Sequence, residues 1–140
     1  MKANRPQRSN NPFALMQLKP SRWKGLVSVD RDGFLNFINP VAGVRAGFIN
    51  LFQAYLYRGY DTIEKIFPLY LGNVKDEKNN PDLYVKLVSE FTGIPPNKQL
   101  TNEELFIVGR AIERVEEGRR WVSDKDFVTG WKAAKMYLNE

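Results

Sequence analysis

The chain contains neither cysteine nor histidine among its 140 residues. Without cysteine there is no disulfide, no thiolate nucleophile and no thiolate metal site. Without histidine there is no Ser-His triad, and the usual nitrogen ligands of zinc are missing. Acid–base chemistry near neutral pH would fall to Asp, Glu, Tyr or Lys. We therefore expect no metal site and no cofactor.

Long apolar runs are missing too. No stretch approaches the roughly 18 apolar residues that a transmembrane helix needs, and the N-terminal stretch "MKANRPQRSNN" has no apolar centre of the kind that secretory signals carry. Hydrophobic residues make up 43% of the chain and aromatic residues 13%, which is enough for a core. The length suits one domain without a transmembrane segment.

Acidic residues are absent before Asp30, whereas the chain as a whole carries a net charge of +5 and has an isoelectric point near 9.5. Such a basic front end suits a polyanionic partner, such as nucleic acid or an anionic cell wall. Alternatively, residues 1–9 are a solvated, flexible basic arm. The six basic residues of the front end are Lys2, Arg5, Arg8, Lys19, Arg22 and Lys24.

A β-hairpin is predicted over residues 23–37, "WKGLVSVDRDGFLNF". Apolar and polar residues alternate on both sides of "DRDG", and Gly33 supplies the position that needs a positive φ. "DRDG" also resembles the start of a calcium loop, but the later acidic ligands are missing, so a turn is the better interpretation.

The rest of the chain reads as about five helices. Asn39-Pro40 and Asn80-Pro81 combine a capping residue with proline at the first helical position, and glycines lie at the predicted ends. Capping patterns precede the remaining helices, at Asp61/Glu64, Thr101/Glu104 and Ser123. Apolar residues recur every three or four positions in each helix. The predicted fold class is mainly α, a helical bundle with one small N-terminal β-hairpin.

Three glutamates gather at the end of the predicted helix that begins after Thr101. Glu113, Glu116 and Glu117 are neighbours on one helical surface, and like charges together with the negative helix terminus raise carboxyl pKa values. Glu116 borders the apolar stripe, and a sheltered carboxyl with a raised pKa suits a general acid. The alternative is that "ERVEEGRR" is a solvated, charged helix end.

Other polar residues are candidates for binding a substrate. Asp30 or Asp32 could supply a second carboxylate across a cleft, as many glycosidases require, or could simply form the turn. Asn10 and Asn11 could bind sugar hydroxyl and acetamido groups, or could tie a loop to the backbone.

Five blocks of the sequence, taken in order, resemble a family of phage and prophage virion proteins that is lysozyme-like. The blocks are "RSNNP" (8–12), "WKGLVSVDRDGFLNFINPVAGVRAG" (23–47), "YLYRGYDTIEKI" (55–66), "NNPDLYVKLVSEFTG" (79–93) and "RAIERVEEG" (110–118). Members of that family typically open with Arg-Asn-Asn-Asn-Pro-Gly-Asn-Ile and carry a late Arg-His-Glu-Asn-Gly. The "NPVAGVRA" segment is the most specific match.

The resemblance implies a lysozyme-like α+β domain over residues 10–118, followed by a helical extension over 119–140. By position, it places the family's late glutamate on Glu116, its paired amides on Asn10 and Asn11, and its helix arginine on Arg45. It implies a virion protein, made in the host cytoplasm, that meets peptidoglycan and other virion proteins. The leading hypothesis is a cell-wall hydrolase, a muramidase or lytic transglycosylase, with Glu116 as the acid.

The sequence departs from the family pattern at two places. Phe13 and Ala14 stand where the family has Gly-Asn, and Val115 and Glu117 stand where it has His and Asn. These departures favour a second hypothesis, a structural virion protein with a degenerate lysozyme-like site. A third is nucleic-acid binding through the basic N-terminus, with an affinity that falls steeply with salt.

Overall fold

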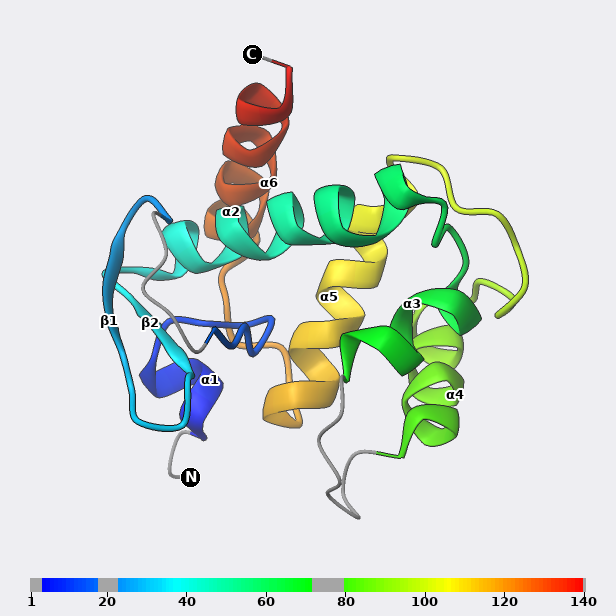
Figure 1. Ribbon diagram of the computed structural model, residues 1–140, viewed down its shortest axis with the longest axis horizontal. Coiled ribbons are helices and arrows are strands. Elements are labelled where there is room, and N and C mark those ends of the chain that lie inside the picture. The colour runs from blue at the N-terminus through cyan, green and yellow to red at the C-terminus, as the bar shows by residue number, and fades with distance from the viewer. Residues whose placement is uncertain (1–3, 18–22, 72–79, 140) are drawn as a thin grey trace.

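The computed structural model describes residues 4–17, 23–71 and 80–139, and within them it is mainly helical with one two-stranded antiparallel sheet. Figure 1 shows α2 crossing the upper part of the molecule, with the hairpin and α1 at one end, α3 and α4 at the other, and α5 between them. The elements are α1 (Arg5–Arg8), β1 (Leu26–Val29), β2 (Leu35–Phe37), α2 (Pro40–Asn50), η1 (Leu51–Tyr55), η2 (Leu56–Arg58), α3 (Ile63–Tyr70), α4 (Pro81–Thr92), α5 (Glu104–Glu117) and α6 (Asp124–Leu138).

The predicted fold class is confirmed. The helices from α2 to α6 are the five that the sequence predicts, and the short helix α1 is an addition. A π-helical turn (η1) and a 3₁₀ turn (η2) continue α2 to Gly59, whose φ of 89° ends it as expected. In the described part of the chain, no helix has both the length and the apolar character that crossing a bilayer requires.

Side-chain caps start most of these helices where the sequence places them. Asn39, Asn80 and Ser123 each accept hydrogen bonds from backbone N–H groups of the first turn. The prediction for α3 is wrong by one residue, because Thr62 and not Asp61 caps it, its hydroxyl accepting a hydrogen bond from the N–H of Lys65.

The hairpin is confirmed, and its turn is built from the side chain of Asp30. Its Oδ1 accepts hydrogen bonds from the N–H groups of Asp32 (2.9 Å) and Phe34 (3.0 Å), and Gly33 has a φ of 86°. This closed turn leaves Asp30 in a structural role. An irregularity in the register between Leu26 and Ser28 interrupts the alternation in β1.

The segment that follows α1 lies directly on the backbone of α2. A Cβ added to Gly43 would stand 1.9 Å from the carbonyl oxygen of Asn10, and one added to Gly47 would stand 1.7 Å from the ring of Phe13. Only glycine allows so close an approach. Asn10 of the "RSNNP" block and Gly43 of the "NPVAGVRA" block therefore pack directly against each other.

Aromatic rings fill the core where α2, α5 and α6 meet. Phe13 packs edge-on against Phe48 at 4.9 Å between centroids, and Phe48 packs edge-on against Phe127 at 5.5 Å. Edge-to-face pairs of this kind stabilise a core beyond their buried area, by about 0.5–1.5 kcal/mol each. Phe127 and Ala134 of α6 are fully buried. The expected division of the chain at residues 10 and 118 stays a prediction, but α6 belongs to this common core.

Leu83, Leu87, Val88 and Phe91 recur at helical spacing and predict the buried stripe of α4. The prediction is wrong in part, because Tyr84 and Val88 face the core whereas Leu83 and Phe91 are exposed. Tyr84 belongs to the core because its ring stacks on Phe67 at 4.9 Å. This orientation of α4 places the Tyr84 hydroxyl beside the end of α5.

Candidate functional site

Glu116 lies in the last turn of α5 and faces α4. The hydroxyl of Tyr84 donates a hydrogen bond of 2.9 Å to its Oε1, and the glutamate is half-buried. Tyr70 of α3 stands next to this pair, its hydroxyl donating to the carbonyl oxygen of Phe13. The sheltered carboxyl predicted at this position is therefore present, with tyrosines as its neighbours.

Burial raises the pKa of Glu116, and the hydrogen bond from Tyr84 offsets part of this effect. Burial, and then the negative charge of Glu116, hold the pKa values of Tyr84 and Tyr70 well above 10, so both phenols stay protonated. The sequence predicts the same direction for Glu116 but gives another cause, the neighbouring glutamates and the helix end. The main cause is loss of water around the carboxyl.

The three glutamates of α5 share one side of the helix but bind three different sets of partners. Glu113 is fully buried, accepts a 2.8 Å hydrogen bond from Arg110, and also binds the N–H groups of Trp121 and Val122. Glu117 turns toward α1. The interpretation of "ERVEEGRR" as a solvated helix end is thus wrong for these two residues.

Glu117 anchors the N-terminal segment. Its carboxylate accepts hydrogen bonds from the N–H groups of Asn4 (2.8 Å) and Gln7 (3.0 Å), at the start of α1. A carboxylate is favourable there because the N-terminus of a helix carries unpaired N–H groups and partial positive charge. The flexible arm expected over residues 1–9 stays a prediction, and within that range residues 5–8 form the helix α1, which Glu117 holds through its first N–H groups.

Asn11 is fully buried, and its amide binds only main-chain groups. Its Nδ2 donates to the carbonyl oxygens of Leu15 and Leu35 at 3.0 Å each, and its Oδ1 accepts from the N–H of Leu15 at 2.9 Å. Asn10 has a φ of 53° and donates from Nδ2 to the carbonyl oxygen of Phe37 at 3.0 Å. Of the two alternatives for these amides, the structure shows the one in which they tie a loop to the backbone.

The hairpin acids have partners other than Glu116. Asp32 forms an exposed ion pair with Arg5 (3.5 Å), and Arg5 also lies over the ring of Phe34. The hairpin and α4, which holds Tyr84, lie at opposite ends of the molecule (Figure 1). Within the described residues, neither Asp30 nor Asp32 forms a hydrogen bond or an ion pair with Glu116, and a site that joins them stays a prediction.

Arg45 is likewise separate from Glu116. Its guanidinium lies 5.1 Å from the ring centre of Tyr137 on α6, and both residues line a groove of about 600 Å³ between α2, α6 and the base of the hairpin. Among the basic residues of the front end, Lys2, Lys19 and Arg22 lie outside the described residues.

Sequence reasoning missed the partners that matter most. From the sequence, Tyr70 and Tyr84 are two of several tyrosines that could line a sugar-binding cleft or belong to the core or its rim, and no partner is predicted for Glu117 or Arg110. The signal for Tyr84 was available, because Tyr84 and Val88 are four residues apart on a capped helix. For Glu117 no signal existed, since its partners are backbone groups more than a hundred residues away in the sequence.

No family model matches the chain. A relative is found in Protein P5 of Pseudoalteromonas phage PM2, which is 32% identical over 120 residues. The match covers 83% of this chain and 72% of the relative. At this identity and coverage, the chain belongs to the family of the phage protein P5.

Proposed function

We propose that this chain is a virion component of a bacteriophage whose fold serves assembly and does not cleave the cell wall. Membership in a phage protein family supports the first part. The second part depends on one observation, the complete burial of Asn11 among main-chain partners. The buried amide of Asn11 holds the loop that contains the "RSNNP" block against the backbone, and it is not accessible to a sugar.

The partners of the hairpin acids also support a role in assembly. Asp30 closes a turn, and Asp32 pairs with Arg5. The chemistry of an inverting or retaining glycosidase needs two carboxyl groups within about 5–9.5 Å of each other, and among the described residues neither hairpin acid shares a hydrogen bond or an ion pair with Glu116.

Particles of the phage or prophage that encodes the chain provide the test. We expect mass spectrometry of gradient-purified particles to find the chain at a constant ratio to the major capsid protein. Absence of the chain from intact particles, with its presence in the lysate, would contradict the proposal.

Glycan-strand cleavage is the second candidate, and the raised pKa of Glu116 favours it. A lytic transglycosylase or muramidase needs an acid that stays protonated until it gives its proton to the glycosidic oxygen. The resulting carboxylate would then take a proton from the sugar's own hydroxyl or from water. Peptidoglycan would be the substrate, and Glu116 the one residue on which this activity depends.

A peptidoglycan zymogram separates the two candidates. The wild-type chain, Glu116→Gln and the control Glu90→Gln are compared, since Glu90 is an exposed acid on α4. The assembly proposal predicts no clearing by any of the three. Clearing by the wild type and the control, but not by Glu116→Gln, would establish the hydrolase instead.

A further inference from the structure

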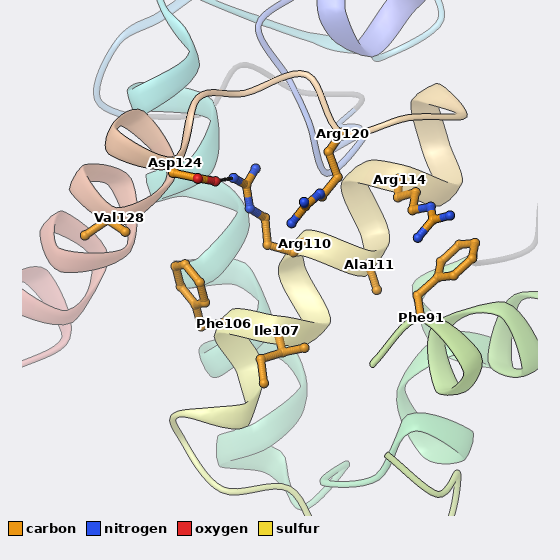
Figure 2. Close-up of a pocket in the computed structure, with 9 residues that line it drawn as sticks. All are labelled: Phe91, Phe106, Ile107, Arg110, Ala111, Arg114, Arg120, Asp124 and Val128. Carbon is orange, nitrogen blue, oxygen red and sulfur yellow. Dashed lines mark hydrogen bonds and ion pairs between the residues drawn. The ribbon is translucent and has the colours of Figure 1, made fainter. Parts of the chain in front are cut away.

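A groove of about 410 Å³ opens between α4, α5 and the start of α6, away from the Glu116–Tyr84 pair. Figure 2 shows Arg110, Arg114 and Arg120 along one part of it, with Ala111 close to them and Ile107 on the preceding turn of α5. We propose that this groove binds an acidic segment of another virion protein, one that carries an apolar side chain flanked by Asp or Glu. The inference rests on the proposed assembly role and names the partner's chemistry.

The charges of the groove are not balanced from within. Arg110 is held by Glu113, at 2.8 Å, and by Asp124. Arg114 and Arg120 form no ion pair with any residue that the structure describes. Two like charges near one rim repel each other, so carboxylates placed between them would be attracted strongly.

Arg114 is also positioned in advance. Its guanidinium lies 4.0 Å from the ring centre of Phe91, a cation–π contact that holds the long side chain at the α4 side of the groove. A guanidinium fixed in this way loses less conformational entropy when it binds a carboxylate. The contact therefore favours binding of an anion at this rim.

The floor of the groove is apolar and open to water. Phe91 is 36% exposed and Ile107 is 45% exposed. Burying such side chains on binding is favourable by roughly 25 cal/mol per Å² of apolar area. Charge complementarity alone would be satisfied by a free anion, but the apolar floor would then stay uncovered. A peptide segment with both acidic and apolar side chains uses both properties.

Nucleic acid fits this groove less well. Its affinity grows with the number of phosphates that cations contact along the backbone. Here two guanidiniums without an ion pair to any described residue flank one open apolar surface, and no row of cations leads away from it in the lining. We therefore assign the groove to a protein partner.

Fluorescence polarisation tests the assignment on the intact purified chain. The probe is a short fluorescein-labelled peptide in which Asp and Glu alternate with Leu and Phe. Two control peptides replace either the acids by Asn and Gln or the apolar residues by Ser, and a labelled single-stranded oligonucleotide is the nucleic-acid arm. We expect saturable binding of the first peptide and weaker binding of all the others.

Paired variants locate the binding. Arg114→Glu with Arg120→Glu should weaken binding of the acidic peptide about tenfold or more, which corresponds to about 1.4 kcal/mol. Arg31→Glu with Arg58→Glu changes the net charge equally at exposed arginines of the hairpin turn and η2, which do not line the groove, and should leave binding within about twofold. Ile107→Asn should weaken binding through the floor without a change of charge. Thermal melts verify that each variant is folded.

Three results would overturn the inference: no saturable binding of the acidic peptide, equal losses in both charge-reversal variants, or tighter binding of the oligonucleotide. Failure here is distinguishable from failure of the proposed function. A chain found in particles that does not bind the peptide loses only the groove assignment. A chain that binds the peptide but is absent from particles loses the virion role.

Discussion

Replacing Asn11 by alanine should destabilise the fold strongly without removing any contact to a ligand. The amide of Asn11 makes three hydrogen bonds of 2.9–3.0 Å to main-chain groups of Leu15 and Leu35, all buried. After the substitution, the carbonyl of Leu15 keeps one bond, from the N–H of Leu35 at 3.1 Å. The N–H of Leu15, by contrast, loses the acceptor that Asn11 provides.

The magnitude follows from these groups. A buried N–H without an acceptor costs about 1–3 kcal/mol, and each further lost hydrogen bond about 0.5–1.5 kcal/mol. The sum is about 2–6 kcal/mol, a large part of the roughly 5–15 kcal/mol by which such domains are stable. At about 3 °C per kcal/mol for a chain of this size, the melting temperature should fall by about 6–18 °C.

Urea unfolding followed by circular dichroism gives the number, with Asn36→Ala as the matched control. Asn36 is a half-buried asparagine of β2, next to Leu35, and its amide makes one long hydrogen bond of 3.4 Å, to the carbonyl oxygen of Phe34. The control should cost less than about 1 kcal/mol. A loss for Asn11→Ala no larger than that of the control would refute the structural role assigned to this amide.

Four further substitutions test contacts of α5 and of α2. Tyr84→Phe should raise the pKa of Glu116 further, because the phenol's hydrogen bond lowers it; a ¹³C titration of the carboxyl group should show this rise, and an unchanged midpoint would contradict the pairing. Because the pKa of Glu116 is raised in the folded protein, the folded state binds this proton more tightly than the unfolded state does. The resulting contribution to the free energy of unfolding is fully present below the unfolded pKa of about 4.5, and it is lost as the pH rises through the folded pKa. Urea unfolding of Glu116→Gln should therefore show a relative gain over wild type from pH 4 to pH 7, and the opposite trend would be incompatible with burial. Glu117→Ala should cost about 1–3 kcal/mol and speed hydrogen exchange at the start of α1, where unchanged exchange would disprove the anchor. Gly47→Ala should cost about 3 kcal/mol in urea unfolding, because the added methyl group meets the ring of Phe13, and tolerance of alanine would show that the loop can move aside.

Much of the fold could be predicted from local sequence signals. Asn39 before Pro40 and Asn80 before Pro81 start helices because a side-chain oxygen and a fixed φ both act within one turn. The phase of α4 could not be predicted in this way. Whether Tyr84 faces the core depends on Phe67 and on Glu116, which come from other parts of the chain.

The candidate site could be predicted only in part. The sheltered position of Glu116 followed from its place beside an apolar stripe. The roles of Asn11 and Glu117 did not follow, because an amide or a carboxylate that binds backbone has the same composition as one that binds a ligand. The glycines Gly43 and Gly47 show the same limit, since their purpose appears only once the loop packed on α2 is seen.

The central claim is that the polar residues resembling a wall-cutting site hold this fold together instead. Its most direct test is the release of soluble muropeptides from purified peptidoglycan sacculi, measured by chromatography after incubation with the wild-type chain. The account predicts no release above that of buffer. Release by the wild type that Glu116→Gln abolishes would contradict it.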